Sequence, residues 1–236
     1  IVRAIPELGY SMFPRDPYIA EYGPYDWEFI EKYFMKNLNM IDGRPDMDNA
    51  YIKKAYEQWK AQGKRWVDET YIPGESYAKE KAKTLTADEA YEYWANGDQG
   101  RPGLSNPFVD GLLGNELHGG SEVAWAAWTE AIKRLHKDFP AKVFYPYSSA
   151  FTDNNGGRLF SKTMMDCGYA FSWEVYLPET GTEYAARELV YEVLRNSMHK
   201  WKTSVPGVER AVMINFGHGI TSVADTTQDV DPGVDF

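Results

Sequence analysis

The sequence predicts an α/β fold of the (β/α)8 TIM-barrel type, as a complete barrel or an incomplete, truncated one. Short apolar and aromatic runs alternate with longer segments of helical periodicity through most of the 236 residues. That alternation is typical of a parallel sheet with helical crossovers. Several short runs end in polar side chains, and the C-terminal strand ends are where barrel enzymes assemble their active sites. The sequence has neither the dinucleotide-binding glycine fingerprint nor the phosphate-binding loop that would favour an open nucleotide-binding sheet.

The first part of the chain predicts two helices and one clear strand. Residues 1–10 form a short strand or an extended entry. Apolar residues recur at helical spacing over residues 27–41, after Asp26 as N-cap. A second helix is predicted over residues 49–61 and ends at Gly63. Residues 64–71 read as a strand with acidic residues near its C-terminal end.

The middle of the chain is predicted to carry the most informative strand. A long polar loop over residues 72–85 precedes a capping box formed by Thr86 and Glu89, which opens a helix. Residues 97–107 are rich in turn-forming residues. Residues 109–120 then begin as an apolar run, end in polar side chains and leave through two glycines. A helix over residues 122–138 follows.

The last part continues the same alternation. The predicted strands cover residues 142–148, 169–177 and 211–218, and the predicted helices cover residues 158–167 and 183–202. This makes five clear strands and a weak one at the start, whereas a complete eightfold barrel usually needs about 250 residues. No linker divides the chain, so we expect a single barrel-type domain over residues 1–236.

Composition restricts the partners. The formal net charge is −10 and no basic stripe is present, which argues against nucleic acid and against anionic membrane surfaces. No apolar run is long enough to span a bilayer. Aromatic residues make up 15% of the chain, enough to line a sugar-binding cleft. The sequence identifies no compartment; a secreted or periplasmic one is our working expectation.

Side chains alternate between the two faces of a strand, so residues two apart are expected to share a face. On this basis four polar side chains at strand ends are predicted to converge on one cleft at the C-terminal rim: Glu69, Glu116, Glu174 and His218. The neighbours assigned to the same faces are Val67 for Glu69, Leu112 and Gly114 for Glu116, Ser172 for Glu174, and Val212 for His218.

Two converging carboxylates are the machinery of glycoside cleavage. One protonated carboxyl donates to the leaving oxygen, and the other attacks the anomeric carbon or activates a water. A separation of about 5–5.5 Å gives retention of configuration, and about 6.5–9.5 Å gives inversion. Trp173 beside Glu174 and Trp66 near Glu69 would supply apolar walls or sugar-stacking faces.

The segment Gly114-Asn115-Glu116 at a strand end resembles the Asn-Glu acid/base signature of the clan of retaining glycoside hydrolases on (β/α)8 barrels. The resemblance implies that Glu116 is the acid/base and that Asn115 holds the substrate's 2-hydroxyl. The family places its nucleophilic glutamate three strands later, and Glu174 is only two strands later. Either a strand is missed, or Glu174 binds substrate and the nucleophile lies outside this chain, or the family is a different one.

The sequence thus predicts a glycoside hydrolase acting on an oligosaccharide or polysaccharide, without cofactor or metal. The catalytic residues are Glu116 and Glu174. The residues expected to contact substrate are Asn115, His118, Glu69, Trp173 and His218. Two alternatives stay open: a metal-dependent sugar isomerase or hydrolase, and a barrel that binds carbohydrate without cleaving it. In the first, a divalent cation would bind to Glu69, Glu116, His118, Glu174 and His218.

Overall fold

Seven of the described strands form one parallel sheet in which spatial order follows sequence order. The computed structural model describes residues 9–10, 18–19, 23–24, 32, 36–74, 83–98, 100–115, 117, 120–148, 151–152, 154–173 and 182–214. The order across the sheet is β1-β4-β5-β8-β9-β10-β11, and every neighbouring pair is parallel. The strands are β1 Gly9–Tyr10, β4 Met40–Asp42, β5 Arg65–Thr70, β8 Gly111–Gly114, β9 Val143–Ser148, β10 Phe171–Trp173 and β11 Val212–Ile214.

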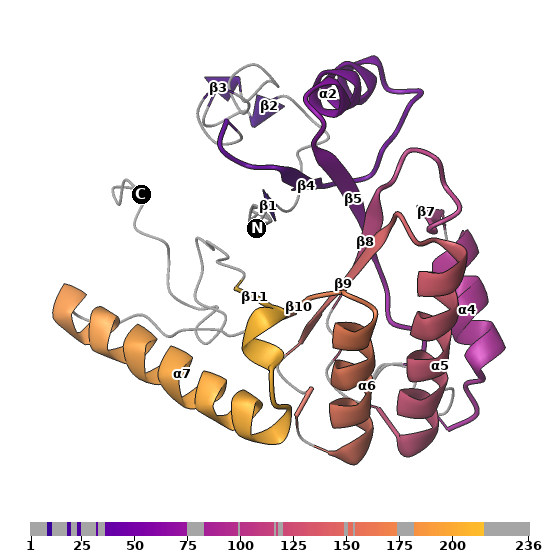
Figure 1. Ribbon diagram of the computed structural model, residues 1–236. Helices are drawn as coiled ribbons and strands as arrows, with labels where there is room; N and C mark the ends of the chain where they lie inside the picture. The colour runs from indigo at the N-terminus through magenta and orange to yellow at the C-terminus, as the bar shows by residue number, and fades with distance from the viewer. Residues whose placement is uncertain are drawn as a thin grey trace, which may run out of the picture.

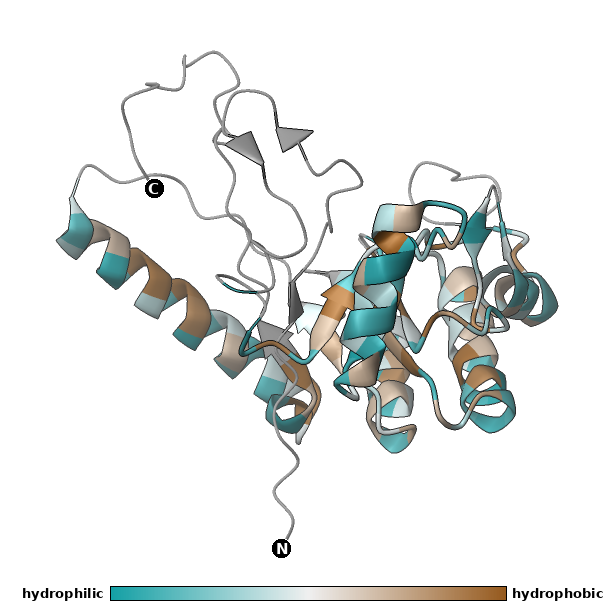
Figure 2. Cartoon of the chain, turned by 90° about the horizontal axis from the view of Figure 1, so that it is seen from above, coloured by the Kyte–Doolittle hydropathy of each residue, from teal (hydrophilic) through white to brown (hydrophobic). Residues whose placement is uncertain are grey.

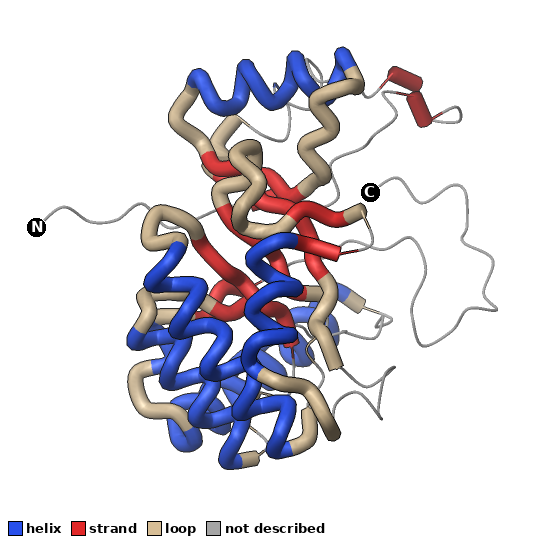
Figure 3. Tube along the Cα trace, turned by 90° about the vertical axis from the view of Figure 1, so that its right-hand side faces the viewer, coloured by secondary structure: helices blue, strands red, loops and turns tan. Residues whose placement is uncertain are grey.

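Helices follow the strands and cover one face of the sheet (Figures 1 and 3). They are α2 Ala50–Ala61, α4 Ala87–Asn96, α5 Glu122–Asp138, α6 Asn155–Asp166 and α7 Glu183–Ser204, with a short 3-10 helix, η3 Val208–Arg210. Two small antiparallel ribbons complete the described elements: β2 Tyr18–Ile19 with β3 Gly23–Pro24, and β6 Gly97–Asp98 with β7 Arg101–Pro102. None of the described helices is long and apolar enough to cross a membrane.

This topology confirms the α/β class and the strand-helix repeat. A doubly wound sheet reverses its strand order and carries helices on both faces. Here the order never reverses, and the helices stay on one side, so the sheet curls like part of a barrel wall (Figure 1). The described strands form an open sheet, however, and do not amount to a complete (β/α)8 barrel, the first of the two predicted forms.

The predicted starts of α4, α5 and α7 match the structure, whereas α6 begins at Asn155, three residues before the predicted start. The α2 N-cap is Asn49, whose side chain accepts from the amides of Tyr51 and Ile52. At α4 both hydrogen bonds of the predicted capping box are present, between Thr86 and Glu89. The α5 helix has the predicted limits. These features depend on residues three or four apart, which the sequence displays directly.

The predicted helix over residues 27–41 is wrong at its C-terminal end. Met40–Asp42 is strand β4, and Ile41 pairs with Trp66 of β5. Ile41 is fully buried between Trp66 and helix α2, so burial inside the sheet outweighs the helical spacing that Ile41 shares with the residues before it. Apart from Lys32, residues 27–35 lie outside the described residues.

The sheet has two different faces. The outer face lies under the helices and contributes Leu112, Phe144 and Phe171 to the main core. The inner face carries a smaller apolar cluster, Met40, Val67, Leu113 and Tyr145. In Figure 2 the helices over the sheet have their hydrophilic residues, drawn in teal, on the side away from the sheet. Helix α7 extends well beyond the strands. Trp201, near the C-terminal end of α7, is the one residue of this helix that is buried.

Candidate active site at the carboxyl edge of the sheet

Polar side chains gather where the parallel strands end. Because neighbouring strands run in the same direction, their C-terminal ends share one edge of the sheet, which is where α/β proteins bind their ligands. The described residues at this edge come from five strands. They are Asp42 at the end of β4, Glu69 on β5, Asn115 after β8, Tyr147 on β9 and Ser172 on β10.

Asn115 lies on the inner face at this edge. Its backbone amide donates to the carbonyl of Thr70 over 2.7 Å, which extends the ladder between β5 and β8 by one residue. Its side-chain Oδ1 accepts a hydrogen bond from the Tyr147 hydroxyl. The Tyr147 ring packs against the inner apolar cluster. The amide is therefore held in one orientation, with Oδ1 toward Tyr147 and Nδ2 left to donate elsewhere.

Glu69 is on the inner side of β5, as predicted, because its face-sharing neighbour Val67 belongs to the inner cluster. Its carboxylate is paired with Arg101, whose Nη1 lies 3.2 Å from Oε2. The same Nη1 donates to the Glu69 carbonyl over 2.9 Å, and Nη2 donates to the Tyr71 hydroxyl over 3.1 Å. Sequence reasoning missed Arg101, since it comes from the β6–β7 ribbon and is distant in sequence.

Asp68 lies on the opposite face of β5 and is only 4% exposed. Oδ1 accepts from the Glu69 amide over 2.9 Å, whereas Oδ2 has no hydrogen-bond partner among the described residues. Burial raises the pKa of this carboxyl from 3.8 to about 6, although the charges of Arg44 and Arg101 oppose the rise. Asp68 is therefore a buried carboxyl that titrates near neutrality, a property that its sequence context does not show.

Stability should depend on pH through Asp68. The folded protein binds this proton more tightly than the unfolded chain, so the stabilisation is full below pH 3.8 and is lost as the pH rises through about 6. We expect wild type to lose up to about 3 kcal/mol between about pH 4 and pH 7 relative to Asp68→Asn. Urea unfolding of both proteins across this range measures the difference. If the free energies of unfolding of the two proteins changed with pH in the same way, this would contradict a protonated Asp68 in the folded state.

The inner-face position predicted for Leu112 and Gly114 is wrong. Leu112 is in the helix-covered core, and a Cβ at Gly114 would lie 2.9 Å from Ile72 Cδ1, so both are on the outer face. Strand β8 ends at Gly114. Asn115 then points to the inner face, while Leu117 is fully buried in the outer core.

The reason for this change of face is a change of hydrogen-bond partner. The Asn115 amide bonds to β5, at Thr70, and the Leu117 amide bonds to β9, at the Tyr147 carbonyl, over 2.9 Å. Strict alternation therefore does not extend across residues 115–117. Glu116 itself lies outside the described residues, and its role stays a prediction.

The strand carrying the second proposed carboxylate has the predicted alternation as far as it is described. Ser172 is fully buried and pairs with Tyr147, and Ala170 packs against the inner cluster. Phe171 belongs to the outer core. The backbone of Trp173 ends β10, but nothing is described of its side chain, and Glu174 lies outside the described residues.

The strand count departs from the glycoside hydrolase pattern in the structure as well. Strand β10 is the second strand after β8, and β11 is the third. The newly found strand β4 comes before β8 and does not alter this count. Val212–Ile214 of β11 carries no carboxylate. Val212 packs against the outer core, and His218 lies outside the described residues.

Metal binding receives no support from the part of the chain that is described. Within it, no group of three or more His, Cys, Asp or Glu side chains could hold a metal ion. Of the five residues considered for a metal site, only Glu69 is described; Glu116, His118, Glu174 and His218 lie outside. Glu69 is the partner of Arg101.

Comparison with known proteins assigns no family. No protein-family model matches the chain, and no curated protein matches it significantly. The functional argument therefore depends on the residues at the carboxyl edge.

Proposed function

We propose that the protein is a carbohydrate-active hydrolase whose site lies at the carboxyl edge of a closed or partial (β/α)8 barrel. Glu116 would be the general acid/base, and Glu174 the second carboxylate. His118, Trp173 and His218 would contact the oligosaccharide or polysaccharide. The observation that carries the proposal is the position of Asn115, which places an oriented amide on the inner face at the point where Glu116 follows in the chain.

The chemistry of the described edge suits a neutral, hydroxyl-rich substrate. The Asn115 amide has Nδ2 available to donate to a sugar hydroxyl. The Glu69–Arg101 pair, with Arg101 4.2 Å from the Tyr71 ring centroid, offers acceptors and donors beside an aromatic surface. Hydrogen bonds to the 2-hydroxyl strengthen in glycoside transition states and supply several kcal/mol. An amide at this position therefore supports glycoside cleavage more specifically than a general binding role.

Asn115→Ala should lower kcat/KM by about 100-fold on a substrate with a 2-hydroxyl, because the transition state loses that hydrogen bond. On the matching 2-deoxy substrate the same substitution should have little effect, since the contact is already missing. Tyr147→Phe serves as the control. It removes the hydrogen bond to Oδ1 of Asn115 but keeps the Asn115 amide, so we expect a smaller loss of kcat/KM, about tenfold. Equal losses on both substrates would show that Asn115 does not bind the 2-hydroxyl.

The proposal as a whole is tested by a screen of aryl glycosides and polysaccharides with wild type and Glu116→Gln. We expect hydrolysis by wild type of at least one class of substrate and a large loss in the variant. Equal activity in both proteins would remove Glu116 from catalysis. Binding of a sugar without turnover, unchanged by the substitution, would show a carbohydrate-binding barrel instead.

A further inference from the structure

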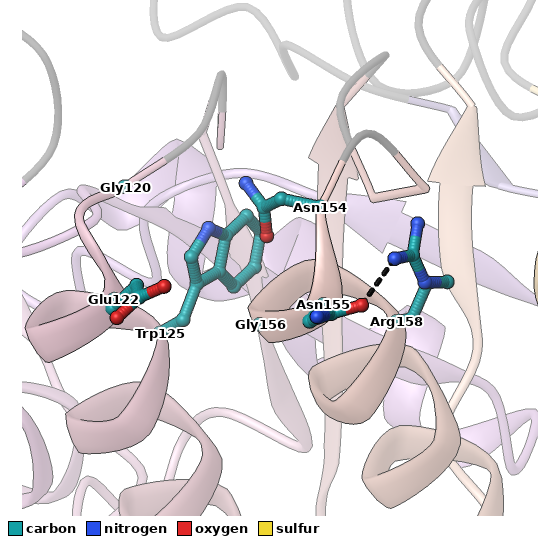
Figure 4. A pocket seen from close by; sticks show the side chains of 7 residues that line it. All are labelled: Gly120, Glu122, Trp125, Asn154, Asn155, Gly156 and Arg158. Carbon is teal, nitrogen blue, oxygen red and sulfur yellow. Dashed lines mark hydrogen bonds between the residues drawn. The ribbon is translucent and has the colours of Figure 1, made fainter.

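A polar pocket of about 300 Å³ lies between the N-terminal ends of α5 and α6, on the helix side of the sheet. It is lined by Gly120, Glu122, Trp125, Asn154, Asn155, Gly156 and Arg158 (Figure 4). The described lining residues come from the starts of these two helices, whereas Glu69 and Asn115 lie on the inner face of the sheet. Its volume is at the lower end of the range for small-molecule sites.

Trp125 is the unusual member of this set. The side chain is 1% exposed, yet its indole Nε1 has no hydrogen-bond partner among the described residues. In Figure 4 the indole nitrogen is on the ring edge that lies between Gly120 and Asn154. A buried polar group without a partner costs about 1–3 kcal/mol, and a buried indole N–H normally has an acceptor.

The other fully buried tryptophans of the described chain all have an acceptor for the indole N–H. Each donates to a backbone carbonyl: Trp59 to Arg65, Trp66 to Gly43, Trp94 to Tyr71 and Trp128 to Pro73, over 2.6 to 3.1 Å. Trp125 packs edge-on against Trp128, with ring centroids 5.0 Å apart. Its indole is therefore positioned as firmly as its neighbour's, but its N–H has no acceptor among the described residues, and the residue is part of the pocket wall.

The indole cannot turn to find an internal acceptor. Gly156 in the first turn of α6 is so close that a Cβ there would lie 2.6 Å from Trp125 Cβ and Cγ. The ring centroid of Phe160, also on α6, lies 5.5 Å from that of Trp125. The absence of a side chain at Gly156 is what allows α6 to start directly against the indole.

The remaining donors around the pocket favour an anionic group. The first-turn amides of α5 and α6 have no partner within their helices, although the Ala124 amide of α5 donates to the Ser121 cap. Helix N-termini attract anions. Asn154 caps α6 by accepting from the Gly157 amide. Arg158 is oriented by hydrogen bonds to the Thr152 carbonyl and to Asn155 Oδ1. Glu122, exposed on the other side, is an acceptor suited to ligand hydroxyls.

We propose that the pocket between α5 and α6 binds a small sugar derivative with one anionic oxo group, a carboxylate or a phosphate. The anionic oxygens accept from the Trp125 indole, the helix amides and Arg158, and the ligand hydroxyls bond to Glu122. None of the described residues that line this pocket is among the residues proposed above for glycoside cleavage.

The test follows the indole N–H resonances of ¹⁵N-labelled protein by NMR, with Trp125→Phe and Trp128→Phe identifying the two signals. Glucuronate, glucose 6-phosphate and glucose are titrated separately. We expect a saturable shift of the Trp125 signal with at least one anionic sugar, a stationary Trp128 signal, and no saturation with glucose. The responding sugar identifies carboxylate or phosphate as the recognised group.

Two charge variants complete the design. Arg158→Gln should weaken binding about tenfold. Lys162→Gln removes a charge from the same helix, where Lys162 pairs with Asp166 at the surface, and should leave binding unchanged. Glu116→Gln should bind like wild type, which separates this site from the catalytic proposal. No saturable shift with either anionic sugar, equal binding of glucose, or unchanged binding by Arg158→Gln would overturn the inference.

Discussion

Phe144→Ala is expected to lower the free energy of unfolding by about 3–5 kcal/mol, the usual cost of removing a fully buried phenylalanine. Phe144, the second residue of β9, is completely inaccessible to solvent, and its ring centroid lies 4.8 Å from that of Trp94 on α4. The substitution opens a cavity between the sheet and the helix layer. Urea unfolding, followed by circular dichroism, measures the loss.

Phe108→Ala is the matched control for that experiment. Phe108 is 40% exposed, and its ring contact is an edge-on approach to Tyr56 with centroids 5.8 Å apart. We expect a cost of about 1 kcal/mol or less. Similar losses in the two variants would contradict a core centred between the outer face of the sheet and the helices.

The helices could be predicted from sequence because their signals are local. The capping box at Thr86 and the apolar spacing of α5 involve residues within one or two turns. Strand β4 could not be predicted, because it has three residues and Ile41 continues a helical phase. Only its pairing with Trp66, 25 positions later, makes it a strand, and such a pairing is not visible in local sequence.

The site could be predicted only in outline. Strand ends with polar residues were recognisable, and Asn115 and Glu69 lie at the expected edge. The alternation rule failed after Gly114, where the backbone changes its hydrogen-bond partner from β5 to β9. The Arg101 partner of Glu69 depends on a ribbon that packs against β5, and so does not follow from spacing.

Glu116→Gln should reduce the kcat/KM for unactivated glycosides by about 100- to 10,000-fold, the usual contribution of general acid catalysis. Glutamine has the size of glutamate but no proton of suitable acidity to give to the leaving oxygen. Folding is checked by comparing the urea midpoints of the two proteins, which should agree. If the loss of kcat/KM came with a lower urea midpoint in the variant, Glu116 would have a structural role instead.

The most direct test of the central claim compares two leaving groups. An alkyl glycoside needs a proton on its leaving oxygen, whereas a dinitrophenyl glycoside of the same sugar leaves without one. We predict that kcat/KM of Glu116→Gln falls by at least about 100-fold on the alkyl glycoside and by less than about tenfold on the dinitrophenyl glycoside. Equal losses on both substrates, or no loss on either, would contradict the assignment of Glu116 as the acid at this edge of the sheet.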